Sequence, residues 1–100
     1  MPLTPQELSN RSYEYKICGT VQDVNTQTNS FTVKWMGNTY TINIVANTVC
    51  EINHMYYPSN SCINHITNGM CLEIKVLQDP VSSTTLTAVK IEDKNPGRCM

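Results

Sequence analysis

Polar and apolar residues alternate along five stretches of the chain. An alternation with a period of two is the pattern of a β-strand that buries one face. The alternating stretches are 13–24, 31–36, 39–44, 70–76 and 84–92. The pattern therefore predicts an all-β chain of five strands.

Turn-forming residues separate these stretches. Residues 25–30 and 79–83 are rich in Asn, Thr, Ser and Asp, and the dipeptide Gly37-Asn38 is a hairpin signal between the second and third strands. Residues 46–68 show no sustained period, so they predict a long irregular connection with room for a short helix. The long connection thus falls between strands three and four.

Two positions predict departures from regular strand geometry. Gly19 lies in the middle of the first strand, where it permits either the sharp coiling of a strand shared by two sheets or a simple bulge. In the last strand the apolar phase changes after Ala88, which predicts a bulge. Both features are typical of a strongly curved sheet.

The order of the segments is that of a small five-stranded OB-like Greek-key barrel. The chain resembles OB domains over residues 16–92, from Cys18-Gly19-Thr20-Val21 through 68–76 to 86–92. Two branches of the OB superfamily are similar: small nucleic-acid-associated subunits of the replication protein A small-subunit type, and OB-like domains of exported bacterial proteins. The first branch implies a barrel that holds a complex together, and the second implies a domain of an envelope protein.

The chain divides into a leader at 1–12, the barrel at 13–92 and a tail at 93–100. The first residues lack the basic start and apolar run of a secretory signal, and no apolar stretch is long enough to span a bilayer. We therefore expect an intracellular protein, in the cytoplasm or nucleus, with no membrane partner. The five cysteines are an odd set, which leaves one thiol unpaired in a monomer and favours a reducing compartment. The alternative is an exported protein.

Charge and alternation argue against tight binding of nucleic acid by the chain alone. Seven Lys or Arg residues face eight Asp or Glu residues, so no strong positive field is expected. Phe31, Val33 and Trp35 share one face, as do Tyr40 and the isoleucines after it, which predicts that these rings point into the barrel. The predicted contacts with a protein partner or with single-stranded nucleic acid are Lys34, Met36, Thr41, Asn43, Tyr56 and Tyr57.

Four lysines could converge into a basic patch, but scattered strand-edge lysines are the favoured interpretation. These lysines are Lys16, Lys34, Lys75 and Lys90. Any contact with single-stranded nucleic acid is therefore expected to be weak or indirect.

Potential metal ligands gather in the irregular connection. Cys50 and His54 are followed by Cys62 and His65, and four such ligands could hold Zn or Cu. Their spacing matches no standard zinc motif, so buried thiols and surface imidazoles are the favoured interpretation, and no cofactor is expected. A disulfide between Cys50 and Cys62 is the other possibility if the protein is exported.

The sequence contains no catalytic motif, which favours a non-catalytic module. His54 and His65 are the only imidazoles, and neither a Gly-x-Ser-x-Gly elbow nor a phosphate-binding glycine loop is present. The leading hypothesis is a binding or scaffold module that acts through protein contacts, as a small accessory subunit of a complex that handles single-stranded nucleic acid. The alternatives are the exported domain with a structural disulfide or metal, and a Zn or Cu module built on residues 50–65.

Overall fold

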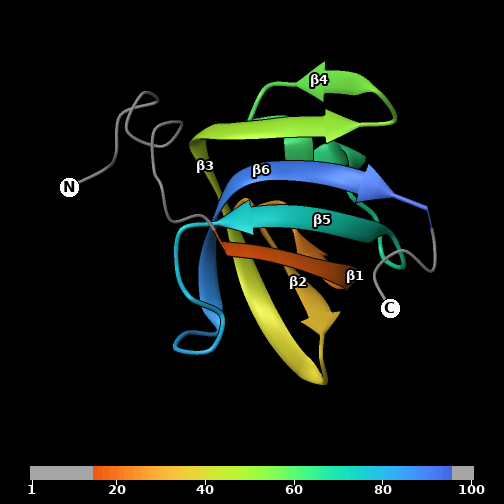
Figure 1. Ribbon diagram of the computed structural model, residues 1–100. Helices are drawn as coiled ribbons and strands as arrows, with labels where there is room; N and C mark the ends of the chain where they lie inside the picture. Colours follow the sequence, from red (N-terminus) through yellow and green to blue (C-terminus); the bar gives the residue numbers. More distant parts are fainter. Residues whose placement is uncertain (1–14, 96–100) are drawn as a thin grey trace.

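The structure is a computed structural model that describes residues 15–95, and it is almost entirely β-sheet (Figure 1). A single short 3-10 helix, η1, interrupts the strands within these residues. The elements are β1 (Tyr15–Asn25), β2 (Ser30–Trp35), β3 (Asn38–Ile52), β4 (Met55–Tyr57), η1 (Cys62–His65), β5 (Cys71–Val76) and β6 (Thr85–Lys94). The predicted leader at 1–12 and residues 96–100 of the predicted tail lie outside the described residues.

Within residues 15–95 five strands close into a barrel, which confirms the predicted fold class. The sheet order is β2-β1-β5-β6-β3-β4, and an additional pairing of β2 with β3 closes the cylinder. Neighbouring strands are antiparallel except for β3 and β6, which run parallel. This is the strand order of an OB-like barrel, and the short β4 adds to β3 outside the closed ring.

The apolar face of each strand fills the barrel. Phe31, Val33 and Ile42 are almost completely buried, and Tyr40 is 3% exposed. Trp35 is half-buried and packs against this core, with its ring 6.0 Å from that of Tyr40. The predicted inward direction of these side chains is therefore correct, because alternation sets the face of every strand.

Gly19 allows β1 to serve two neighbours. The first half of β1 pairs with β5 and the second half with β2, and the two pairings overlap at Thr20. A Cβ atom at position 19 would lie 2.9 Å from the carbonyl oxygen of Lys34 and 3.0 Å from the Cβ of Val33. The missing side chain therefore permits close approach of β2. The register irregularity lies farther along, between Val21 and Asp23.

The long connection is more regular than the sequence predicts. β3 continues to Ile52, and a tight turn at Asn53 and His54, both with positive φ, leads into β4. The expectation of an irregular segment from residue 46 is therefore wrong for the first part of the connection, whereas the short helix is present as η1. Burial does alternate at the end of β3, but the sequence conceals it because polar Thr48 is buried whereas apolar Val49 is exposed.

The β2–β3 turn and the end of β6 also differ from their predicted positions. The β2–β3 turn is formed by Met36 and Gly37, with φ of 53° and 80°, so it lies one residue before the predicted Gly37-Asn38 dipeptide. The predicted bulge after Ala88 is present, because Val76 faces Ala88 whereas Lys75 faces Lys90. β6 runs on to Lys94, which pairs with Cys71 and takes the first residues of the predicted tail into the sheet.

Candidate binding surface

A buried disulfide joins β3 to η1 at one end of the barrel. Cys50 and Cys62 form this bond with a Cα–Cα distance of 6.0 Å, and they are 1% and 0% exposed. Ile63 and Ile66 belong to the same buried core as the two cysteines. All four cysteines in the described part of the chain are disulfide-bonded. The β4 hairpin lies between the two bonded residues in the sequence, so the disulfide encloses it in a short covalent loop.

Aromatic side chains of β4 line this end of the barrel. Tyr57 stacks on the imidazole of His65, with ring centroids 3.6 Å apart and planes 18° apart. The next side chain of β4, Tyr56, points to the opposite face of the strand and is 67% exposed. In the strand register it pairs with Glu51 of β3. The next outward residue of β3 on the same face is Val49, which is 43% exposed. We call Val49, Glu51 and Tyr56 the β3–β4 face.

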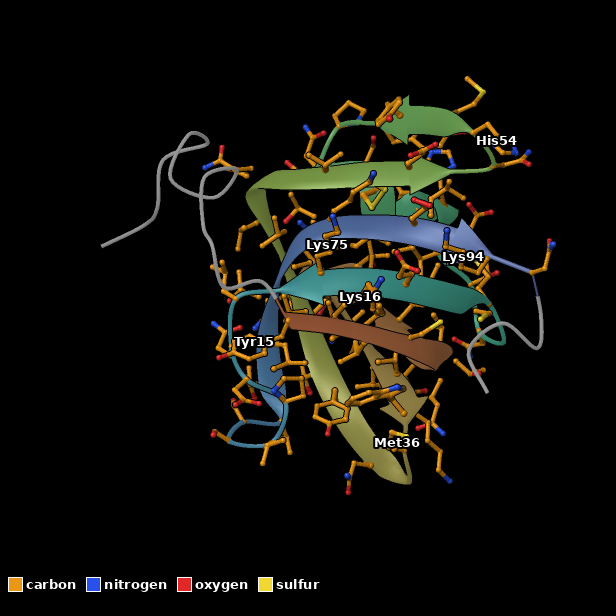
Figure 2. All side chains as sticks on the ribbon, viewed as in Figure 1. Tyr15, Lys16, Met36, His54, Lys75 and Lys94 are labelled. Atoms are coloured by element: carbon orange, nitrogen blue, oxygen red, sulfur yellow. A yellow bond between two sulfur atoms is a disulfide. The ribbon has the colours of Figure 1, made fainter. Side chains whose placement is uncertain are left out.

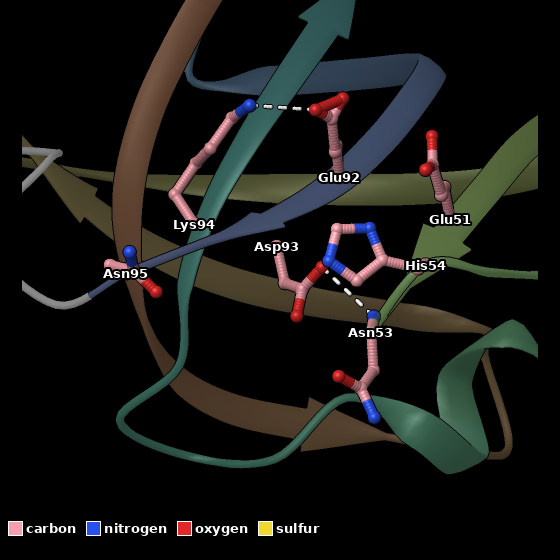
Figure 3. Close-up of a pocket in the computed structure, with 7 residues that line it drawn as sticks. All are labelled: Glu51, Asn53, His54, Glu92, Asp93, Lys94 and Asn95. Atoms are coloured by element: carbon pink, nitrogen blue, oxygen red, sulfur yellow. Dashed lines mark hydrogen bonds and ion pairs between the residues drawn. The ribbon is translucent and has the colours of Figure 1, made fainter.

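A polar pocket of about 370 Å³ opens beside the β3–β4 turn (Figure 3). Its lining residues are Glu51, Asn53, His54, Glu92, Asp93, Lys94 and Asn95. The backbone N–H of Asn53 donates to Asp93 Oδ1 at 3.0 Å, which ties the turn to the end of β6. The pocket is therefore built by two strand ends that are about forty residues apart in the sequence.

On the outer face of the sheet, a row of lysines lies beside a row of glutamates. Lys16, Lys75 and Lys90 are register partners across β1, β5 and β6, so the expectation of scattered lysines is wrong for these three. The adjacent row contains Glu73, Glu92 and Glu51. A lysine row beside a glutamate row gives this face little net charge. Figure 2 shows Lys16 and Lys75 close together over the middle of the barrel.

Two lysines bond with the glutamate row. Lys94 Nζ donates to Glu92 Oε1 at 2.6 Å, and Lys90 Nζ lies 3.8 Å from both Glu51 and Glu92. The hydrogen bond from Lys94 lowers the pKa of Glu92 below its ordinary value, although burial opposes the shift. Lys90 is thus the member of the lysine row that contacts the glutamate row, at 3.8 Å from Glu51 and from Glu92.

The predicted metal ligands are not arranged as a site in this oxidised chain. The sulfur atoms of Cys50 and Cys62 bond to each other, so neither is a thiolate ligand. His65 stacks on Tyr57, whereas His54 lines the polar pocket. Among the described residues, no three His, Cys, Asp or Glu side chains are positioned to hold a metal ion. The Zn or Cu hypothesis therefore applies only to a reduced form of the connection.

The predicted contact residues occupy two ends of the molecule. Lys34 and Met36 are exposed near the β2–β3 turn, with Thr41 and Asn43 half-buried on β3. Tyr56 and Tyr57 lie on β4, at the opposite end in Figure 1. The structure does not bring the six into one patch. The pocket residues on β6 went unpredicted, because Glu92, Asp93 and Lys94 look like an ordinary polar strand end.

The fold and this surface define a small, disulfide-containing, OB-like barrel. No family model matches the chain, and no curated protein sequence matches it. Among solved structures, it is similar to the crystal structure of Ag(I)CusF, with a TM-score of 0.55 and 11% sequence identity. The similarity covers 82% of this chain and 99% of CusF, and at this identity it establishes a shared barrel fold alone.

Proposed function

We propose that the chain is a non-catalytic, exported OB-like module that binds a protein partner through the β3–β4 face. The observation that carries this proposal is the buried Cys50–Cys62 disulfide, which fixes the segment that presents Tyr56. Tyrosine is a common energetic centre of protein interfaces because its ring buries a large area while its hydroxyl keeps a hydrogen bond. Glu51 and Lys90 supply a polar rim beside the ring.

The cysteine chemistry supports export in preference to the intracellular location that the sequence favours. Structural disulfides persist in the periplasm and outside cells and are rare in the cytoplasm. The oxidised Cys50–Cys62 pair therefore favours the exported branch of the resemblance. The described residues contain no helix that is long and apolar enough to cross a membrane.

The accessory-subunit hypothesis for nucleic acid gains little from the structure. A single-strand binder uses exposed rings and a positive groove. Here Tyr40 is buried, Trp35 is half-buried, and the lysine row runs beside three glutamates. These observations support a protein partner over direct contact with phosphate.

The test is photocrosslinking of the exported chain with benzoylphenylalanine in place of Tyr56. The matched control carries the same probe at Gln27, which is exposed in the β1–β2 turn. We expect a discrete protein adduct from position 56 only. The purified partner should then bind the wild type and lose about tenfold or more in affinity for Tyr56→Ser, since one buried aromatic anchor is worth this much.

Three results would contradict the proposed function. Equal crosslinking at both positions, or partner binding that ignores Tyr56→Ser, would remove the β3–β4 face as the docking surface. Tight binding of a dT oligonucleotide at physiological salt would favour the nucleic-acid hypothesis instead. Because Tyr56 is 67% exposed, its substitution should leave the unfolding midpoint unchanged, which separates lost binding from lost folding.

A further inference from the structure

Like charges lie side by side in two rows on the outer face of the sheet. Lys16 of β1, Lys75 of β5 and Lys90 of β6 are direct register partners. Glu73 and Glu92 are direct partners in the adjacent row. Like charges at directly opposite positions of neighbouring strands destabilise a sheet. The arrangement therefore favours a partner that places opposite charges over both rows.

Glu73 has the weakest charge compensation of the glutamate row. Its neighbours along β5 are completely buried, so its own side chain points outward, where it is half-buried. Its register partners are Cys18 and Glu92, neither of which is a cation. Glu51 and Glu92 each lie 3.8 Å or less from a lysine Nζ, whereas the Glu73 side chain makes no ion pair or hydrogen bond within residues 15–95. This carboxylate is available to a cation from outside the chain.

The two rows are complementary to each other under a two-fold rotation. Lys75 follows Glu73 by two residues on β5, so the two side chains lie on the same face. The same spacing separates Lys90 and Glu92 on β6. A two-fold axis that runs between the rows, parallel to them, turns each row onto the other. Lys75 of one copy then faces Glu73 of the other, and the contact occurs twice.

Exposed apolar side chains continue both rows at the β3–β4 edge. Val49 is the register partner of Lys90 and so extends the lysine row. Tyr56 is the register partner of Glu51 and ends the glutamate row. Val49 is 43% exposed and Tyr56 is 67% exposed. The rotation that exchanges the rows brings Tyr56 of one copy beside Val49 of the other, which adds an apolar flank to the charged contact.

We propose that the partner of the β3–β4 face is a second copy of this chain, held by a two-fold contact between the lysine and glutamate rows. This inference rests on the proposed function, because Val49, Glu51 and Tyr56 belong to both surfaces. The rows cross four strands. Strands are spaced by about 4.8 Å, so the contact is smaller than the roughly 800 Å² per partner of a stable interface. The dimer is therefore weak, and its affinity falls with salt because exposed charges are screened.

The test is sedimentation of the whole oxidised chain in the ultracentrifuge over a range of concentrations, at low and at physiological salt. We expect a monomer–dimer equilibrium whose dissociation constant rises with salt. Glu73→Lys and Lys75→Glu should each raise this constant about tenfold or more, because each variant places like charges face to face twice. Lys34→Glu is the matched control, since Lys34 is exposed on β2 outside both rows, and it should leave the constant unchanged.

Two combinations of these substitutions identify the contact itself. Glu73→Lys has lysine at both β5 positions and Lys75→Glu has glutamate at both, so an equal mixture should form a heterodimer more tightly than either variant pairs with itself. The double variant Glu73→Lys/Lys75→Glu exchanges the two charges within one chain and should regain the wild-type affinity. Both rescues require position 73 of one copy to face position 75 of the other. Restored association also shows that the single variants are folded.

A chain that stays monomeric at every concentration overturns the inference. A mixture and a double variant that associate no better than the single variants overturn it as well, and so does a dimer that ignores both charge reversals. The crosslink at position 56 separates this inference from the proposed function. An adduct of twice the chain mass supports both, whereas an adduct with a different protein keeps the proposed function and overturns the second copy. Neither adduct nor dimer would remove both.

Discussion

Thr48 shows how a single hydroxyl stabilises an irregular part of the barrel. Between Ile44 and Val49 of β3 the register with β6 shifts, so several β3 residues have no ladder partner there. Thr48 is 5% exposed, and its hydroxyl donates to the carbonyl of Ala88 at 2.7 Å while accepting the N–H of Val45 at 3.0 Å. One side chain thus bonds to two backbone groups at the point where the β3–β6 register shifts.

We expect Thr48→Val to lower the free energy of unfolding by about 1–3 kcal/mol, because a donor and an acceptor lose their partner at a buried position. Thr48→Ser keeps the hydroxyl and should cost less. Urea denaturation of the three proteins measures both values. Equal losses for Val and Ser would show that the methyl group, and not the hydroxyl, matters at this position.

At the scale of elements, the β4 hairpin and η1 are an addition to the closed barrel. β4 pairs with β3 through three register positions, and η1 is a single turn. Elements this short are marginal by themselves, since few hydrogen bonds offset the entropy of ordering their residues. The disulfide between Cys50 and Cys62, with a sequence separation of 12, supplies the constraint that they need.

Reduction of this bond should lower the free energy of unfolding by about 3 kcal/mol, the loop-entropy value for a loop of this length. A Cys50→Ala/Cys62→Ala double variant is the control, and its response to reductant should lack this contribution. Because Cys18 and Cys71 are also disulfide-bonded, the loss from this bond is the reductant-induced change in urea stability of the wild type minus that of the double variant. Reduction of the folded protein should be slow because both sulfur atoms are buried. Rapid reduction without loss of stability would contradict a structural role.

At the scale of the whole molecule, barrel closure depends on one strand serving two neighbours. β1 pairs with β5 and then with β2, and Gly19 lies just before the residue at which the pairings overlap. The carbonyl of Lys34 and the side chain of Val33 occupy the space that a Cβ would need. The backbones of β1 and β2 can approach this closely only when the position is glycine.

Gly19→Ala should therefore lower the free energy of unfolding by about 1–3 kcal/mol, the usual cost of forcing an extra group into packed surroundings. Thr20→Ala is an exposed neighbour on the same strand and should cost less than about 1 kcal/mol. Thermal or urea unfolding followed by circular dichroism compares the two variants. If Gly19→Ala is as stable as Thr20→Ala, then the close approach of β1 and β2 does not require glycine at position 19.

The sequence determined which residues form the five barrel strands and which of their faces is buried, because alternation is local and is read directly from the chain. It also indicated the bulge in β6 and the short helix in the connection. It proposed Met36, Tyr56 and Tyr57 as contact residues, and for Cys50 it left a metal site and a disulfide with Cys62 open.

Only the tertiary structure decided which of these residues lie together. The strand extension to Ile52, the lysine and glutamate rows, the polar pocket and the hydrogen bond from Tyr40 to Pro80 all join segments far apart in the chain. Strand register and barrel closure create these neighbours, and neither leaves a local signal. The choice between thiol, metal ligand and disulfide for Cys50 and Cys62 was likewise open until the fold placed their sulfur atoms in contact.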